Sequence, residues 1–440
     1  MDENREVSLP MMLECREQRA QTQKDLIAKY GKTLVSFSMN IAGPVKTSYL
    51  IERGFFIGQE RLLGSLYTYK AKVLFSSFRF PVTGPEGFFV VDLDPLKVKD
   101  ICIDIENQDQ LGRLFDLDVI APDGTKLERK EERCCLICNK PAKECSSRRL
   151  HTVEQLWNKT TSILSKSVLE HDSELAASLA VKALMYEVLT TPKPGLVDRN
   201  NTGSHQDMDL FTFSASACTL FSYFQKAYAL GFNSTDPQAC FTQLRQLGKT
   251  AEQAMFCETR GVNTHKGAIF TLGIVCCAVG FTATTKTDIF QVCAEMTRGI
   301  TQELKDSSGP ETNGKLFYTQ YGITGIRGEM EDGLPAVKNI GLPLLEKYLA
   351  AGKSLEEAGS RVLITLIAEV ADTNMIARGG FEYSYLARSK AEDLMSWAFR
   401  LSEVEKLDKW FIEKNLSPGG CADLLAVCYF LHFVKERFYV

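Results

Sequence analysis

The sequence lacks the features that mark membrane-spanning, secreted and nucleic-acid-binding proteins. It has no run of eighteen consecutive apolar residues, and no apolar segment follows a basic one near its start, so we expect neither a transmembrane helix nor a signal peptide. Lysine and arginine number 51 against 55 aspartate and glutamate, whereas nucleic-acid-binding domains are strongly basic. We therefore expect a cytoplasmic protein whose partners include neither membranes nor nucleic acid.

Internal repeats and low-complexity segments are also absent. The composition, with 45% hydrophobic and 24% charged residues, is that of a globular protein, and the 14 cysteines of a cytoplasmic chain are expected to be reduced. A chain of 440 residues is longer than one hydrophobic core usually serves, which predicts two domains.

The two parts of the chain differ in their apolar pattern. After a helical segment near residues 14–30, short runs typical of strands are separated by Gly, Pro and Asn or Asp turns. From about residue 152 long helical patterns take over, and the first has Asp172 or Ser173 as its expected N-cap. We predict an α+β domain over residues 1–165 and an all-α helical domain over residues 166–440. The expected strands are "TLVSFSMNI" (33–41), "KVLFSSFRF" (72–80), "GFFVVDLD" (87–94), "ICIDI" (101–105) and "FDLDVI" (115–120).

Two carboxylates in the first part form a candidate metal site. Asp116 and Asp118 lie two residues apart on an expected strand, so both side chains point to the same face of the sheet. A divalent cation relieves the repulsion between converging carboxylates and also binds phosphate oxygens. Arg113 and Lys46, each next to an expected turn, are candidate phosphate ligands. The alternative is the solvent-facing edge of a half-buried strand.

The segment "CLICNKPAKECSSRRLH" contains Cys135, Cys138, Cys145 and His151. Four soft ligands within seventeen residues are compatible with a closed tetrahedral zinc site. However, the chain is rich in cysteine generally, and the spacing does not match the common zinc-finger patterns. Both interpretations stay open at this point.

Several motifs of the first part resemble a known family in the same order. "VSLPMMLECREQRAQTQKDLIAKYGKTLVSFSMNIAGPVK", "TGPEGFFVVD", "GRLFDLDVI" and "RCCLICNKPAKECSSRRLHTVEQL" resemble citrate lyase holo-acyl-carrier-protein synthase, the apo-citrate lyase phosphoribosyl-dephospho-CoA transferase. The resemblance implies a nucleotidyltransferase-like domain with a catalytic Mg²⁺ on Asp116 and Asp118, and Glu106 on the expected preceding strand as a further ligand. It also implies that Lys46 and Arg113 hold a triphosphate, and that the acceptor is a serine of the citrate lyase acyl carrier protein, the gamma subunit.

In the second part, polar residues collect at glycine-bearing junctions between helices. "TPKPGLVDRNNTGSHQDMD" (191–209) is fixed in an extended form by its prolines and gains no expected stability from burial, so a ligand explains its polar density. The alternative is a solvated loop with a helix cap at Asp207. "ETRGVNTHKGAIFTLG" (258–273) sets polar residues before an apolar helix, where free N–H groups favour a triphosphate. Later junctions are "GIRGEMEDG" and "ADTNMIARGG"; caps and ion pairs explain part of their charge.

These motifs, together with "SPGGCADLLA", resemble triphosphoribosyl-dephospho-CoA synthase over residues 170–435. The resemblance implies that ATP and 3'-dephospho-CoA give 2'-(5''-triphosphoribosyl)-3'-dephospho-CoA and adenine, in a bifunctional bacterial cytoplasmic enzyme. Carboxylates for proton transfer, charge balance or catalysis are expected among Asp198, Asp207, Asp209, Glu329 and Asp372, with Mg²⁺ on Asp209. Substrate ligands are expected among Lys193, Arg199, Asn263, Lys266, Arg327, Asp372 and Arg378, and the acid is His205 or His265.

Two other functions fit parts of this pattern. The helical part is also compatible with a hydrolase that cleaves the N-glycosidic bond of a nucleotide or of ADP-ribose, with water as the acceptor. The cysteine segment is compatible with a zinc-dependent module that binds RNA or a protein.

Overall fold

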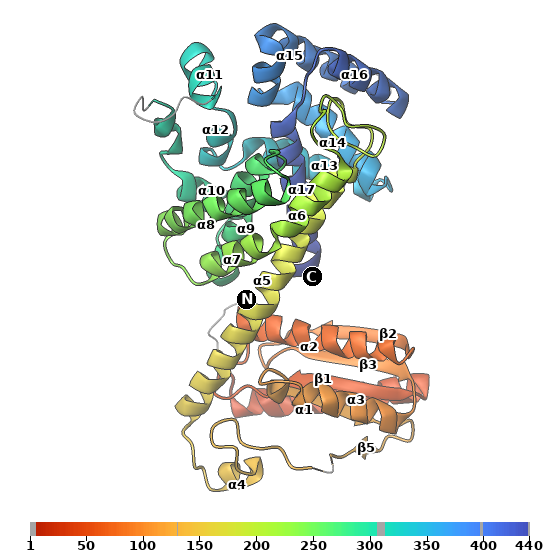
Figure 1. Cartoon of the computed structure of the whole chain (residues 1–440). Coiled ribbons are helices and arrows are strands. Elements are labelled where there is room, and N and C mark those ends of the chain that lie inside the picture. The colour runs from red at the N-terminus through yellow and green to blue at the C-terminus, as the bar shows by residue number, and fades with distance from the viewer. Residues whose placement is uncertain (1–5, 130, 306–312, 397–398, 439–440) are drawn as a thin grey trace. The chain divides into compact units, whose positions relative to one another are not determined.

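The chain forms two compact units, Met1–His171 and Asp172–Val440 (Figure 1). This computed structural model describes residues 6–129, 131–305, 313–396 and 399–438. Helix α5 (Val153–Leu189) contributes residues to both units.

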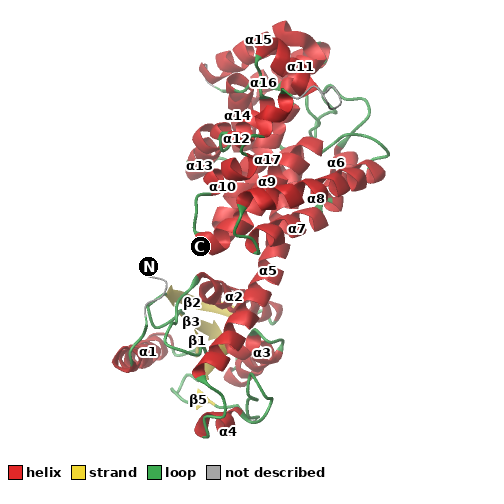
Figure 2. Cartoon of the chain, turned by 90° about the vertical axis from the view of Figure 1, so that its left-hand side faces the viewer, coloured by secondary structure: helices red, strands yellow, loops and turns green. Residues whose placement is uncertain are grey.

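An antiparallel sheet with the strand order β2-β3-β1-β4-β5 is the centre of the first unit. Helix α1 covers one face, where Leu26 packs with Leu34 and Phe88. Helix α2 covers the other face, where the ring of Phe55 stacks on Phe37 with centroids 4.5 Å apart, and α3 lies on this side as well (Figure 2). The elements are α1 (Leu9–Tyr30), β1 (Thr33–Met39), α2 (Tyr49–Thr68), β2 (Lys72–Arg79), β3 (Glu86–Asp92), α3 (Pro95–Asn107), a 3-10 turn (Gly112–Leu114), β4 (Phe115–Ile120), β5 (Lys126–Leu127) and α4 (Ala142–Ser147).

The α+β prediction for this part is confirmed, with one strand wrong. Residues 101–105 belong to helix α3, which begins after Asp94, whose carboxylate caps the N–H groups of Leu96 and Lys97. The buried residues of α3 recur at three- and four-residue intervals, including Val98 and Cys102, which is a helical period that a five-residue window hides. Helix α2 was not anticipated.

The second unit is all-α, as predicted. Its central helix α9 packs against α7, α8, α10 and α17. The helices are α6 (Leu210–Thr219), α7 (Phe221–Phe232), α8 (Pro237–Glu258), α9 (Lys266–Thr285), α10 (Ile289–Thr297), a 3-10 helix (Ile300–Leu304), α11 (Asn313–Tyr321), α12 (Gly325–Glu331), a π-helical turn (Val337–Gly341), α13 (Leu342–Ala350), α14 (Leu355–Glu369), α15 (Thr373–Ser396), α16 (Leu401–Glu413) and α17 (Gly419–Phe438).

The helix expected to begin at Asp172 or Ser173 begins at Val153 instead. No glycine or proline interrupts the sequence from Val153 to Leu189, so the helix continues through Asp172 and Ser173. Both polar residues are buried in the middle of α5. The two compact units therefore divide inside a helix rather than at a linker.

Helix α9 is long and apolar enough, by length and mean hydropathy, to cross a membrane. No other helix in the described part of the chain meets this test. Its most apolar window is 83% buried inside the protein, as in the core helix of a globular domain.

Candidate active sites

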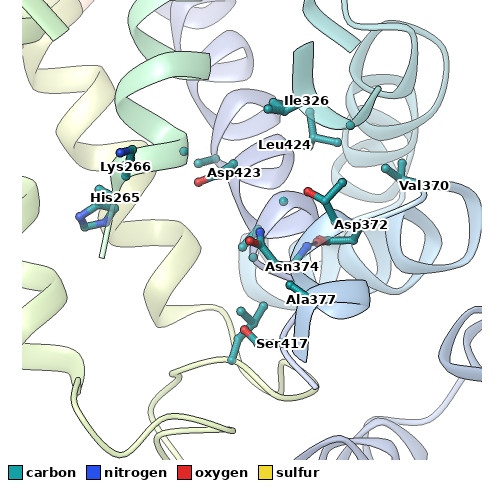
Figure 3. Close-up of a pocket in the computed structure, with 18 of the residues that line it drawn as sticks. His265, Lys266, Ile326, Val370, Asp372, Asn374, Ala377, Ser417, Asp423 and Leu424 are labelled. Carbon is teal, nitrogen blue, oxygen red and sulfur yellow. Dashed lines mark hydrogen bonds between the residues drawn. The ribbon is translucent and has the colours of Figure 1, made fainter. Parts of the chain in front are cut away.

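A cavity of about 820 Å³ lies among the helices of the second unit (Figure 3). Three helices begin at its wall: α9 at Lys266, α15 at Thr373 and α17 at Gly419. The first N–H groups of a helix carry partial positive charge, so three such ends at one cavity favour an anion. The lining includes nine of the residues predicted from the sequence: Lys193, His205, Asp207, Asn263, His265, Lys266, Glu329, Asp372 and Arg378.

The junction at residues 191–209 leads into this cavity, and its two parts differ in burial. Residues 191–198 are buried, so the expectation that burial does not stabilise the junction is wrong for this part, whereas residues 199–209 are mostly exposed. The N–H of Gly195 donates to Asp408 on α16 (2.8 Å), and Gly195 has a φ of +69°. A Cβ at Gly195 would lie 2.2 Å from the carbonyl oxygen of Leu416, so only glycine fits this turn.

A buried ion pair joins this loop to the end of α5. The Nζ atom of Lys193 lies 2.5 Å from Oε1 of Glu187, and both side chains are almost fully buried. Burial raises the pKa of Glu187, and the charge of Lys193 opposes that shift. Glu187 was missed in the sequence; its only signal is a lone acid among apolar residues in "LMYEVL".

Asp423 on α17 is a further acidic residue of the cavity lining. In Figure 3 it lies between Lys266 and Asp372. A Cβ at Gly267 would lie 1.9 Å from Oδ2 of Asp423, so the carboxylate sits directly against the first turn of α9. Burial, with the charges of Glu187 and Asp372, raises the pKa of Asp423 well above its usual range. No donor in the described part of the chain hydrogen-bonds to it.

Asp372 and Glu329, in contrast, organise the backbone at the cavity. Asp372 accepts hydrogen bonds from the N–H groups of Asn374 (2.7 Å) on α15 and Cys421 (2.9 Å) on α17, which joins two helix starts. Glu329 accepts from the N–H of Ala336 (3.1 Å). Burial raises the pKa of both carboxyls.

His265 directly precedes α9, and a chain of hydrogen bonds through two hydroxyl groups holds its ring. Thr264 donates to Ser216 (2.7 Å), and the Ser216 hydroxyl lies 2.7 Å from Nδ1 of His265. A hydrogen bond donated by Ser216 to Nδ1 corresponds to the tautomer that carries the histidine proton on Nε2. Nε2 is buried and has no partner among the described residues. Burial and the charge of Lys193 lower the pKa of His265 to about 3, so the ring is neutral at physiological pH.

His205 and Arg378 lie together at another part of the wall. Nε2 of His205 is 2.9 Å from the hydroxyl of Ser417, and Nδ1 is 4.0 Å from Asp207. Burial, with the charge of Arg378, lowers the pKa of His205. Arg378 itself donates to Asn415 and to a loop carbonyl, so its guanidinium also fastens the loops.

Four predicted residues lie outside the lining of this cavity. Asp198 folds its own loop by accepting from the N–H groups of Lys193, Asn200 and Asn201. Arg199 pairs with Glu356 on the surface. Asp209 is exposed and caps α6 in a capping box with Thr212. The helix cap of this junction is therefore Asp209 and not Asp207.

The fourth, Arg327, lines a neighbouring pocket of about 350 Å³. That pocket shares Lys266, Gly267 and Ile326 with the main cavity. Nη1 of Arg327 is buried and has no partner among the described residues.

In the first unit, Asp116 and Asp118 share one face of β4, as predicted. Ser38 on β1 lies opposite Asp116 on one side and opposite Glu86 of β3 on the other, so the three side chains form a row across the sheet. Burial and the neighbouring charge of Asp118 raise the pKa of Asp116. Asp118 is paired with Lys126 (2.6 Å).

Arginines that the sequence did not single out surround this row. Arg19 and Arg79 both pair with the buried carboxylate of Glu86, each at 2.5 Å. Nη2 of Arg79 is buried without a partner among the described residues. Lys46 donates to the carbonyl of Ile41, and burial and the nearby charge of Arg16 lower its pKa. Adjacent cations and an unpaired guanidinium nitrogen suit a polyphosphate.

Glu106 does not face this site as a free ligand. It lies on helix α3, not on a strand, and is buried. Its carboxylate accepts from the N–H of Leu117 (2.8 Å) and pairs with Arg129 (2.9 Å) and Arg133 (2.6 Å). Arg133 also lies 3.8 Å from Asp116. Glu106 therefore orients Arg133 beside the carboxylate pair.

The cysteine segment brings its four predicted ligands together. The ligand atoms of Cys135, Cys138, Cys145 and His151 all lie within 4.8 Å of one another. Sγ of Cys138 is 3.3 Å from Sγ of Cys145 and 3.3 Å from Nε2 of His151. The guanidinium of Arg113 donates to the carbonyl of Cys134 at the start of this segment.

Comparison with known proteins gives two family matches along the chain. Residues 7–167 match the CitX family, apo-citrate lyase phosphoribosyl-dephospho-CoA transferase, and residues 173–439 match the CitG family, ATP:dephospho-CoA triphosphoribosyl transferase.

Full-length relatives carry both parts. Protein CitXG of Haemophilus influenzae is 35% identical over 98% of this chain and 97% of that protein. Protein CitXG of Leuconostoc mesenteroides is 33% identical over 97% of each. The 2-(5''-triphosphoribosyl)-3'-dephosphocoenzyme-A synthase of Haemophilus ducreyi is 37% identical over 67% of this chain and 98% of that protein. Both resemblances seen in the motifs are thereby confirmed, and the chain belongs to the CitXG family of fused CitX and CitG transferases.

Proposed function

We propose that the cavity of the second unit joins ATP to 3'-dephospho-CoA with release of adenine, and that the Asp116 and Asp118 face of the first unit attaches the product to citrate lyase. The family makes the chain a transferase in the synthesis and attachment of the citrate lyase prosthetic group. The observation that supports the first location is an unpaired carboxylate, Asp423, at a cavity where three helices begin. We assign the two activities to residues 166–440 and 1–165.

In the second unit, the helix starts and Lys266 bind the triphosphate of ATP. The 2'-hydroxyl oxygen of dephospho-CoA forms a bond to C1' of the ATP ribose while the C1'–N9 bond to adenine breaks. Asp423 takes the hydroxyl proton, because a carboxyl with a raised pKa is the stronger base. The Nε2–H of neutral His265 donates a hydrogen bond to the departing adenine. The negative charge of the carboxylates balances the oxocarbenium character that develops at C1'.

Magnesium suits the carboxylates of both sites. In the cavity, Glu187 and Asp372 contribute negative charge near Asp423, and Mg²⁺ bound with the triphosphate would offset part of the charge of this lining. Asp209 does not fit this role, since it is exposed and occupied as a helix cap. In the first unit, Asp116 and Asp118 fit it. Bound Mg²⁺ supplies neutralisation of phosphate charge at both places.

The smaller pocket beside the cavity suits part of the second nucleotide. The reaction needs ATP and dephospho-CoA together, and the two pockets meet at Lys266, Gly267 and Ile326. The unpaired Nη1 of Arg327, with the ring of Phe270 in the same lining, offers a cation and an apolar surface. We therefore place a phosphate-bearing portion of dephospho-CoA here.

In the first unit, we propose nucleotidyltransferase-like chemistry. The serine hydroxyl of the acyl carrier protein, the gamma subunit of citrate lyase, attacks the α-phosphorus of the triphosphoribosyl group. A P–O bond to serine forms, the P–O bond to pyrophosphate breaks, and a phosphodiester remains. Arg19, Arg79 and Arg133 bind the phosphates next to Asp116. For the cysteine segment we propose zinc, the ion that a Cys₃His set suits.

Mass spectrometry of the apo carrier protein tests this function. The carrier is incubated with the full chain, ATP, dephospho-CoA and Mg²⁺, and the expected mass increase requires all four. Chromatography of the same mixtures measures adenine. Adenine released equally without dephospho-CoA contradicts the transferase assignment and supports the nucleotide hydrolase.

A further inference from the structure

The segment 131–151 has almost no hydrophobic interior of its own. Within this range, all of which is described, only Cys135 and Cys145 are buried. Its one helix, α4, has six residues. A segment that cannot bury apolar side chains needs a cross-link or a metal to hold one conformation. The two side chains that it does bury are both members of the Cys/His cluster.

The backbone around the cluster is already shaped for a metal. The N–H of Cys135 donates to the carbonyl of Lys140 (2.6 Å), and the N–H of Ile137 points to Sγ of Cys135 (3.5 Å). Asn139, directly after Cys138, takes a left-handed conformation with a φ of +57° in the tight turn that joins Cys135 to Lys140. These contacts hold Cys135 and Cys138 with both thiols on the same side of the turn, as tetrahedral coordination of one ion requires.

The same segment reaches the phosphate-binding face of the first unit. The carbonyl of Arg133 accepts from the N–H of Ala142 (2.8 Å), so the turn fixes the backbone of Arg133. The guanidinium of Arg133 then bridges Glu106 (2.6 Å) and Asp116 (3.8 Å). Arg113 holds Cys134, the residue after Arg133, by donating a hydrogen bond to its carbonyl oxygen.

We infer that Cys135, Cys138, Cys145 and His151 bind one zinc ion, and that this ion supports the attachment step by positioning Arg133 against Asp116. The ion lies in no reaction step, because all four coordination positions are filled by protein. The positioning role rests on the proposed attachment at Asp116, whereas the zinc site itself does not.

The first test is the metal content of the purified full chain. Plasma mass spectrometry is expected to find one zinc per chain, and Cys138→Ser is expected to lose most of it, with an affinity weakened by about ten-fold or more. Cys134→Ser is the matched control, since this neighbouring thiol lies outside the cluster, and it should keep the ion. A wild-type chain that lacks zinc overturns the proposal, as does a thiol titration that shows a Cys138–Cys145 disulfide instead.

The second test measures the two activities of the same variants. For Cys138→Ser, attachment should fall by about ten-fold or more while adenine release by the second unit is unchanged, which reports that the rest of the chain is folded. Equal loss of both activities contradicts a specific positioning role.

A double-mutant cycle distinguishes positioning from simple loss of structure. If zinc acts through Arg133, the Cys138→Ser and Arg133→Ala double variant attaches no more slowly than the worse single variant. Additive losses contradict this pathway. If the wild-type chain binds zinc but modifies no carrier, the proposed function fails and the zinc site stands.

Discussion

At the residue scale, Asp423 and Asp209 show what a sequence cannot tell about an acid near a helix start. Both belong to polar junctions next to apolar helices, and only Asp209 was assigned a metal. In the structure Asp209 caps its own helix, while Asp423 lies in the second turn of α17 and faces the cavity. The difference depends on α9, α15 and α17 meeting in space, and nothing in the local sequence encodes that meeting.

Replacement of Asp423 by asparagine tests its role as the base. Asp423→Asn keeps the shape of the side chain but cannot take a proton, so adenine release should fall by about 10²- to 10⁴-fold. The matched control is Asp209→Asn, which replaces one favourable helix-capping residue by another outside the cavity. Its rate of adenine release should stay within about two-fold of the wild-type rate. Chromatographic assay of adenine measures both. An Asp423→Asn enzyme as fast as the control refutes the assignment.

The same carboxyl predicts a dependence of stability on pH. Its pKa in the folded chain is raised, so the fold disfavours the charged form, and Asp423 destabilises the protein increasingly as pH rises from about 4 through the raised value. Asp423→Asn should therefore have a higher melting temperature than the wild type at pH 8. That advantage should shrink as the pH falls toward about 4 and vanish below it, where the carboxyl is protonated in both states. Thermal scans at several pH values check this; an advantage independent of pH contradicts the raised pKa.

At the element scale, the helix starts decide the geometry of the cavity. The sequence correctly placed a polar junction before α9, because His265 and Lys266 stand directly before an apolar run. The predicted start of α5 was wrong, because the helix continues on the N-terminal side of Asp172 as far as Val153. Residues 101–105 of α3 were predicted as a strand, because five residues are too few to show a helical period and the N-cap of the helix, Asp94, lies outside them.

The first turn of α9 offers a test at this scale. Gly267→Ala places a methyl group 1.9 Å from the present position of Oδ2 of Asp423, so the carboxylate must move, and adenine release should fall by about ten-fold or more. Gly64→Ala in α2, where no atom lies within 4 Å of the new methyl group, is the control. It should stabilise the chain by about 0.5–1 kcal/mol and leave adenine release unchanged. Equal rates for the two variants show that the position of Asp423 does not limit the reaction.

At the scale of the whole molecule, each proposed site is built from one unit alone. Every residue that lines the cavity falls within Asp172–Val440, and the paired aspartates with their arginines fall within Met1–His171. The order of the motifs already indicated two activities in one chain. Within each unit, the site is assembled by contacts between segments that are distant in the sequence, such as the ion pair of Glu86 with Arg19. The order of the motifs could not predict these contacts.

Because each site is complete within its unit, two inactive variants should complement each other when mixed. Asp423→Asn should release adenine about 10²- to 10⁴-fold more slowly but still attach a supplied intermediate. Asp116→Asn should release adenine but leave the carrier unmodified. A mixture of the two, with ATP, dephospho-CoA, Mg²⁺ and apo carrier, should restore the mass increase, since the intermediate made by one chain diffuses to the other. Each variant alone is the control. A mixture that releases adenine but modifies no carrier means that the intermediate does not leave the chain that makes it, and the two sites are then coupled rather than independent.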